Sequence, residues 1–225
     1  MKYLHGLLRS QGFSLSMLKD SKSILLLQHF CDIMSWGIRK VIEFCKGIPE
    51  FISLTLADQI FLLKGGCLEM LVLRSYFAFA SDGNKYMSEK FQYQPCDFLK
   101  AGGSKEFVEA YNSLHLRMRK MKLQIEEICL LLALVLFSPD RRGLEQSEKV
   151  NEVQVNVALA LQAFEYTHKP REKARAKYCE ILLILPMMRT INKLFSENLE
   201  DLQQDYEGEM NPLIFEVNRS RRDSV

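Results

Sequence analysis

Two charged residues, Glu69 and Arg74, lie inside a stretch that is otherwise almost wholly apolar, from Ala57 to Phe79. A charge in such surroundings is costly unless it is paired or lines a cavity. Arginine keeps its charge, and its planar guanidinium matches a carboxylate with two parallel hydrogen bonds. The sequence therefore predicts that Arg74 binds either the carboxylate of a bound small molecule or a carboxylate or carbonyl group of the protein itself.

The other residue types give no pattern that is typical of catalysis or of a metal site. The histidines lack the spacing of metal ligands, the cysteines include no CxxC pair, and no HExxH motif, nucleophile elbow or phosphate-binding glycine loop occurs. These residues are His5, His29, His115 and His168, with Cys31, Cys45, Cys67, Cys96, Cys129 and Cys179. We therefore expect a binding protein without metal or cofactor, not an enzyme, with reduced and buried cysteines typical of an intracellular protein.

The length and composition suit one domain with a large core. The chain has 225 residues, of which 48% are hydrophobic, and its net charge of +2 gives no reason to expect a nucleic-acid-binding surface. The longest apolar run, Ile128 to Phe137, is too short to span a bilayer, and no cleavable signal pattern opens the chain. We expect no contact of this chain with nucleic acid or membrane.

A proline-interrupted junction between two helices organises the expected fold. The first helix should end near Lys46, because Pro49 disfavours helical geometry at the residue before it and has no N–H to donate. The second should start near Thr55, which with Asp58 three residues later is similar to a capping box. Lys46 and Lys64 then lie near the ends of two helices that must pack together.

Hydrophobic periodicity predicts a mostly helical chain around this junction. The expected elements are helices over 23–46, 57–79, 104–122, 123–137, 147–167 and 172–202, the last kinked at Pro186, and a small hairpin within 86–93. The predicted organisation is a short helix and flexible segment over 1–22, a core over 23–210, a terminal helix over 211–218 and a basic tail over 219–225.

Three motifs resemble the ligand-binding domains of nuclear receptors. They are the segment from Phe44 to Glu69, which contains FCKGIPEF and DQIFLLK, the loop SPDRRG over 138–143, and PLIFEV over 212–217. Within the family the chain is most similar to the vitamin D receptor branch, and there to the nematode dauer-formation receptor, which responds to steroid acids called dafachronic acids. The resemblance covers about Ser23 to Val217.

This resemblance implies an all-α fold, a three-layer antiparallel sandwich of about a dozen helices with a small β-hairpin, a buried pocket and a mobile last helix. The implied function is that of a ligand-activated transcription factor in the nucleus, with a steroid-acid ligand. The cysteine pairs of the family's zinc DNA-binding domain are absent from the sequence, so the chain resembles a ligand-binding fragment.

The resemblance also implies a groove that binds coactivator helices of sequence LxxLL. Glu216 would bind the free N–H groups at the start of such a helix, and Lys46 would bind the free carbonyls at its end, in agreement with the helix dipole. The remaining residues expected at this groove are Lys64, Ile42, Ile60, Leu63 and Leu213.

The family pattern likewise implies a ligand pocket around Arg74 and Ser75. Taken singly, each apolar candidate is more typical of core than of a ligand contact. The set is Phe30, Ile33, Met34 and Gly37 on one wall, Leu71 and Ala78 on a second, Phe195 and Leu199 opposite, Ile214 at the end, and Met87 on the hairpin. Phe195 and Gly103 fall where the vitamin D receptor pattern has polar residues, which argues against a hydroxylated vitamin D ligand.

Two further expectations concern structure and assembly. Glu69 and Arg141 should form a structural ion pair, and the 172–202 stretch resembles the family's dimerisation helix. On that helix Ile181, Leu185 and Met188 are either partly exposed for a retinoid X receptor-like partner or buried within the monomer.

Other functions remain open on the sequence alone. One is a constitutive or xenobiotic-sensing orphan receptor domain, and another is a lipid carrier without signalling. The lipid carrier leaves Lys46 and Glu216 unexplained.

Overall fold

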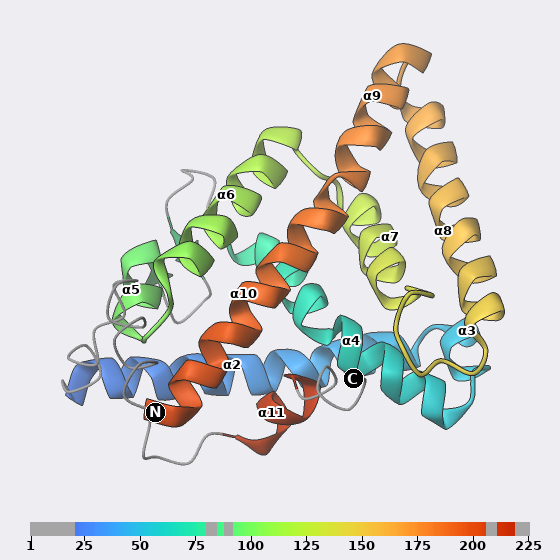
Figure 1. Cartoon of the computed structure of the whole chain (residues 1–225). Coiled ribbons are helices and arrows are strands. Elements are labelled where there is room, and N and C mark those ends of the chain that lie inside the picture. The colour runs from blue at the N-terminus through green and yellow to red at the C-terminus, as the bar shows by residue number, and fades with distance from the viewer. Residues whose placement is uncertain (1–20, 80–84, 88–91, 206–210, 219–225) are drawn as a thin grey trace, which may run out of the picture.

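The computed structural model describes residues 21–79, 85–87, 92–205 and 211–218 (Figure 1). The predicted helix and flexible segment over 1–22 fall almost entirely outside this part, and so do the basic tail over 219–225 and the last five residues of the predicted core, 206–210. The described chain is almost wholly α-helical, with two short strands. The all-α sandwich fold predicted from the sequence is confirmed.

The fold is arranged around α4 (Leu56–Arg74), which occupies the middle layer. It contacts α2 (Ser21–Lys46) on one side and α10 (Ile184–Asp205) on the other. It also contacts α7 (Ile125–Leu136) and the terminal helix α11 (Pro212–Asn218). Because other helices cover α4 from several sides, eight of its residues are buried. This central position explains why the helix is apolar nearly all round.

The junction between α2 and α4 forms as predicted, with one additional helix. Thr55 caps α4, because its side-chain oxygen accepts a hydrogen bond from the Asp58 backbone N–H at 3.2 Å. Pro49 occupies the first position of α3 (Pro49–Ile52), where its missing N–H costs nothing. The sequence predicted only a connection there.

Two long helices predicted from the sequence are each divided. The helix expected over 57–79 ends at Arg74 and continues as the 3-10 helix η3 (Ser75–Ala78). The helix expected over 172–202 is split at Leu183 into α9 (Arg171–Leu182) and α10. Pro186 cannot donate to the Leu182 carbonyl, so α9 ends there, and Pro186 lies in the first turn of α10, where an N–H has no partner within the helix.

The remaining elements complete the outer layers. The hairpin is present, with β1 (Tyr86–Met87) paired antiparallel to β2 (Gln92–Tyr93). A short helix that was not predicted, α5 (Pro95–Lys100), leads into α6 (Lys105–Met121). The long α8 (Ser147–His168) packs against α7 and α9. Among the described helices, none has both the length and the apolar character that crossing a membrane requires.

Candidate ligand site and coactivator groove

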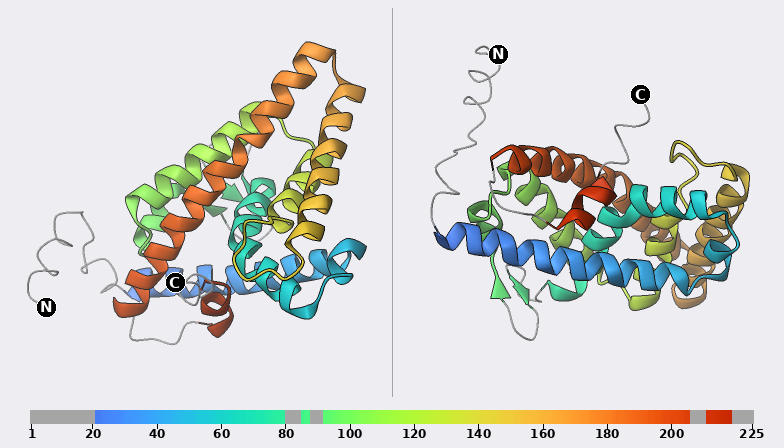
Figure 2. Two further views of the ribbon diagram at one scale, coloured as in Figure 1. Left: turned by 45° about the vertical axis from the view of Figure 1, so that its right-hand side comes forward. Right: turned by 90° about the horizontal axis from the view of Figure 1, so that it is seen from below.

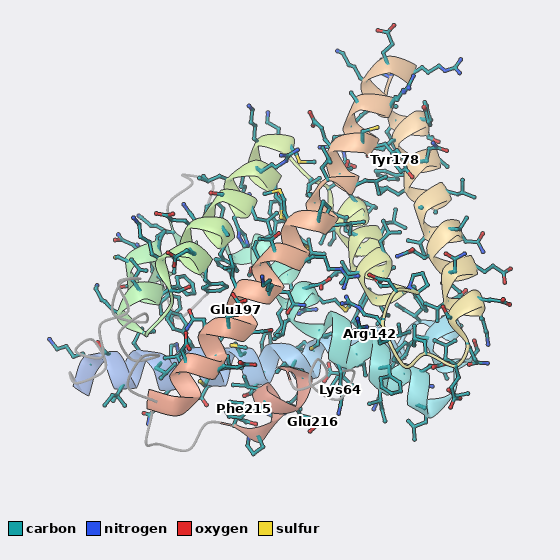
Figure 3. All side chains as sticks on the ribbon, viewed as in Figure 1. Lys64, Arg142, Tyr178, Glu197, Phe215 and Glu216 are labelled. Carbon is teal, nitrogen blue, oxygen red and sulfur yellow. The ribbon has the colours of Figure 1, made fainter. Side chains whose placement is uncertain are left out.

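The terminal helix α11 is docked against α4 and α2 (Figure 2). Ile214 and Val217 are buried and anchor it to the core. Glu216, on the opposite face of α11, forms an ion pair with Lys64 of α4 (Figure 3). The apolar side of α11 therefore holds the helix in place, and its charged side is tied to α4.

The residues expected to form the coactivator groove lie on the three helices that meet here. Ile42, Leu63 and Leu213 are half-buried and pack against the core, whereas Ile60 is 43% exposed. Lys46 is exposed in the last turn of α2. The ion pair joins Glu216 to Lys64, so Lys64 of α4 directly contacts the terminal helix.

The motif residues Asp58 and Gln59 have structural roles at the start of α4, next to the residues expected to form the groove. The buried Asp58 carboxylate accepts hydrogen bonds from the backbone N–H groups of Glu145 and Gln146, at 2.8 and 3.0 Å. The Gln59 side-chain amide donates to the Leu54 carbonyl at 2.9 Å. These bonds fix the start of α4 to the segment that precedes α8, and thereby set the position of Lys64.

A set of half-buried aromatic rings connects the elements around the expected ligand pocket. Phe30 of α2 stacks on Phe98 of α5 at 4.7 Å between ring centroids, and it lies 4.8 Å from Tyr93 of β2. Phe98 contacts Tyr111 of α6 at 5.6 Å. Of these rings, only Phe30 was identified from the sequence as a ligand-site residue, because the others gain their proximity from the packing of distant elements.

A polar network crosses this aromatic region. The Tyr111 hydroxyl donates to Ser75 Oγ at 2.7 Å, and Ser75 Oγ lies 2.8 Å from His115 Nε2. The Ser75 hydroxyl donates to the Val72 carbonyl at 2.7 Å, and His115 Nδ1 donates to the Tyr111 carbonyl at 2.7 Å. Burial lowers the pKa of His115 to about 4 and raises the pKa of Tyr111 to about 12. Both side chains are therefore neutral near pH 7, and Ser75 joins η3 to α6.

Arg74 lies beside this network, in the last turn of α4. The residue is half-buried, and within the described part of the chain no hydrogen bond or ion pair joins its guanidinium to another residue. The negative end of the helix dipole favours a cation at this position. Of the two partners that the sequence left open, a protein carboxylate is not found among the described residues.

The other predicted pocket residues are distributed between the interior and the surface. Met34, Leu71, Ala78 and Phe195 are half-buried, Leu199 and Ile214 are buried, and Ile33 is 39% exposed. Gly37 is buried where α2 crosses α4, since a Cβ atom there would lie 2.6 Å from Leu71 Cδ2. The close approach at Gly37 is thus made by a neighbouring helix. Met87 lies in β1, and its side chain is outside the described residues.

The two departures from the vitamin D receptor pattern both have packing contacts. Phe195 of α10 meets Phe107 of α6 at 5.4 Å between centroids, edge to face. Gly103 lies in the turn between α5 and α6, where a Cβ atom would lie 2.7 Å from the Phe98 carbonyl oxygen. A side chain at position 103 therefore does not fit this turn. At position 195 the side chain makes an aromatic contact, where the vitamin D receptor pattern has a polar residue.

Glu69 is bound from three directions inside the fold. Arg141 Nη2 lies 3.1 Å from Glu69 Oε2, so the two residues predicted as a structural ion pair are in contact. Arg189 Nη1 and Asn192 Nδ2 of α10 bind the other oxygen, at 3.2 and 2.9 Å. Arg189 and Asn192 were not predicted, because no local sequence pattern places them beside α4.

Two of the three apolar residues predicted on the dimerisation stretch face the interior. Ile181 and Met188 are buried, so these two residues stabilise the monomer, and Leu185 is half-buried. The large apolar residue that this stretch does expose is Leu183, at 53%, at the break between α9 and α10.

Comparison with known proteins gives consistent matches over most of the chain. Residues 19–203 match the family described as the ligand-binding domain of nuclear hormone receptor. The chain is 34% identical to vitamin D3 receptor B of Danio rerio over 203 residues, which is 88% of this chain and 48% of the relative. It is 33% identical to nuclear receptor subfamily 1 group I member 3 of Mus musculus over 192 residues, 85% of this chain and 53% of the relative. It is 32% identical to the vitamin D3 receptor of Sus scrofa over 206 residues, 90% and 48% respectively. The chain spans about half the length of the curated relatives it matches.

Proposed function

Because the chain belongs to the nuclear hormone receptor ligand-binding domain family, with relatives among vitamin D3 receptors and group I receptors, we propose that it is the ligand-responsive part of a transcription factor that acts in the nucleus. Binding of a small apolar molecule would be read out by the terminal helix. The observation that carries the choice of ligand is Arg74, a half-buried cation with no charged partner among the described residues.

The ligand class we propose is a steroid acid, similar to the dafachronic acids. An acid group would supply the carboxylate that Arg74 lacks, since a guanidinium and a carboxylate form two parallel hydrogen bonds. The stacked rings of Phe30 and Phe98, which are among the aromatic side chains joined to Tyr111 and Ser75, would accommodate the apolar ring system. The similarity of FCKGIPEF, DQIFLLK and PLIFEV to the nematode dauer-formation receptor supports the same ligand class.

The test compares a sterol acid with its methyl ester on wild-type protein and on Arg74→Met. We expect wild type to bind the acid more tightly than the ester, because the ester removes the negative charge, and Arg74→Met to bind both alike. Arg39→Met, which removes an exposed arginine of α2, is the matched control and should keep the preference for the acid. Equal affinities for acid and ester in wild type would exclude the acid at Arg74.

The groove beside α11 is proposed to bind an LxxLL helix. Lys46 at the end of α2 would contact the free carbonyls of the peptide, and Glu216 would contact its free N–H groups. Ile60 and the half-buried Ile42, Leu63 and Leu213 offer the apolar floor. Lys64 would hold Glu216 in position through the ion pair already formed.

Fluorescence anisotropy with a labelled LxxLL peptide tests this groove. Glu216→Ala and Lys46→Ala should abolish peptide binding and leave sterol-acid binding intact, whereas Lys193→Ala, at an exposed position of α10, should change neither. Unchanged peptide affinity in both groove variants would exclude the charge clamp. Equal peptide binding with and without sterol acid would favour a constitutive receptor domain, and no peptide binding under either condition would favour a lipid carrier.

A further inference from the structure

Four charged side chains meet where α7, α8 and α9 join, in the upper part of Figure 1 and far from α11. Glu127 lies in the first turn of α7 and Glu165 near the end of α8, and their side chains are 1% and 0% exposed. Lys169 follows the last residue of α8, and Lys177 lies on α9. Two carboxyl groups are thus buried together at a junction of three helices.

The lysines and one backbone group satisfy only part of these carboxyl groups. Lys169 Nζ lies 2.6 Å from Glu165 Oε2 and 3.6 Å from Glu127 Oε1. Lys177 Nζ is 3.9 Å from Glu127 Oε1 and donates its hydrogen bond to the Met121 carbonyl at the end of α6. The Gln124 backbone N–H donates to Glu127 Oε2 at 2.5 Å.

The remaining oxygen of each carboxyl group, Oε1 of Glu127 and Oε1 of Glu165, is shielded from solvent and has no donor from the rest of the described chain. Burial, and after it the proximity of the Glu165 carboxyl group, raises the pKa of Glu127. A hydrogen bond between two carboxyl groups requires that one of them carries a proton, because an ionised carboxylate is an acceptor only.

We infer that Glu127 and Glu165 share one proton in the folded protein, and that this proton is a pH-sensitive latch that joins α7, α8 and α9. With the proton in place, the two oxygens attract each other. When the proton leaves, two negative oxygens face each other in a buried site and repel. Lys169 and Lys177 are the charged groups within ion-pair distance, whereas Glu126 and His168, the adjacent titratable residues, are exposed.

The direction of the pH effect follows from proton binding. The folded protein holds this proton more tightly than the unfolded chain, in which a glutamate titrates with a pKa of about 4.3. Stability from the pair is therefore fully present below that value and is lost as pH rises towards the folded pKa. A buried glutamate that stays ionised beside a cation has a lowered pKa, so its contribution to stability would instead be lost as pH falls.

The test is urea unfolding of the whole chain at pH 5, 6, 7 and 8, compared between wild type and Glu165→Gln. Glutamine keeps a donor towards Glu127 and has no proton to lose. Between the pKa of the unfolded chain and the pKa of the folded pair, the unfolding equilibrium constant of wild type should rise relative to that of Glu165→Gln. The rise should reach up to about tenfold per pH unit. Glu126→Gln makes the same chemical change at an exposed neighbour and should parallel wild type.

Infrared spectroscopy gives a readout that a purely structural contact would not change. The carbonyl band of a protonated carboxyl group should persist to higher pH in wild type than in Glu165→Gln. The inference of a shared proton would be overturned if unfolding had the same pH dependence in these two proteins. It would also be overturned if their carbonyl bands disappeared at the same pH. If Glu165→Gln does not fold, Glu127→Gln carries the same comparison, since its amide donates to Glu165 and its oxygen still accepts from Gln124.

Discussion

At the scale of single residues, His115 is a titratable group held neutral in the interior. It donates through Nδ1 to the Tyr111 carbonyl, and its Nε2 lies 2.8 Å from Ser75 Oγ. Burial is the main cause of its lowered pKa, because a protonated imidazole loses its hydration there. The network therefore depends on an unprotonated histidine.

Stability should fall as pH decreases from 6.5 towards 4. In this interval the unfolded chain binds a proton at His115 and the folded protein does not, since its folded pKa is about 4. The full effect is on the order of 3 kcal/mol. His115→Gln should lose this part of the dependence, as measured by the difference between its urea unfolding curves and those of wild type at pH 7, 6 and 5. Parallel pH dependence in the two proteins would contradict a neutral His115.

Arg141→Met should destabilise the protein by about 3 kcal/mol, because it removes one cation from a buried carboxylate. Arg189 and Asn192 still bind Glu69 in this variant and keep the loss at the lower end of the range for broken buried pairs. Arg39→Met on the surface of α2 is the control and should change stability by less than about 0.5 kcal/mol. A loss at Arg141 as small as that of the control would show that Arg141 does not compensate Glu69.

At the scale of elements, two glycines mark close approaches of different kinds. At Gly37 the obstacle to a Cβ atom is the end of the Leu71 side chain, which can turn away. At Gly103 the obstacle is the Phe98 backbone carbonyl, which also accepts the Gly103 N–H at 2.8 Å. The crossing of α2 with α4 is therefore adjustable, and the turn between α5 and α6 is not.

Gly103→Ala should accordingly cost about 1–3 kcal/mol in urea unfolding. Gly37→Ala should cost less, because alanine gains about 1 kcal/mol in helix propensity and offsets the displacement of Leu71. In a Leu71→Ala background, Gly37→Ala should become stabilising. The reverse order of the two glycine variants would contradict this account of the two contacts.

The sequence predicted those parts of the fold and site whose causes are local. Pro49 and Thr55 act on neighbouring residues, so the break between α2 and α4 could be predicted, and Arg74 stood out against its apolar surroundings. For the 172–202 stretch the sequence predicted a kink caused by Pro186, and the structure has a complete break at Leu183, next to the Leu182 carbonyl that lacks the bond. The contacts of Ser75 with Tyr111 and His115 span 36 and 40 residues and depend on how α6 packs on η3, which no local pattern reports.

At the scale of the whole molecule, the α9–α10 edge is the surface we propose for a partner subunit such as a retinoid X receptor-like protein. Ile181 and Met188 face the interior, so they are not available to a partner. Leu183 is the exposed apolar group at the centre of this edge, and it lies at the helix break.

Leu183→Glu should weaken self-association or heterodimer formation at least tenfold, because it places a charge in an apolar contact. Sedimentation velocity measures the effect, and Leu159→Glu on the exposed face of α8 is the matched control. Sterol-acid binding should be unchanged in both variants. If Leu159→Glu weakens association and Leu183→Glu does not, the partner surface lies on α8.

The contacts of Arg141, Arg189 and Asn192 with the Glu69 carboxylate have a consequence for the order of folding. They come from positions 72, 120 and 123 residues further along the chain, so the contacts of Arg189 and Asn192 cannot form until α10 has packed against α4. Contacts of such long range are costly to close early, because a long loop must first be ordered. Substitutions at Arg141, Arg189 or Asn192 should therefore mainly accelerate unfolding and leave the refolding rate nearly unchanged, which makes this network a determinant of how long the folded domain persists.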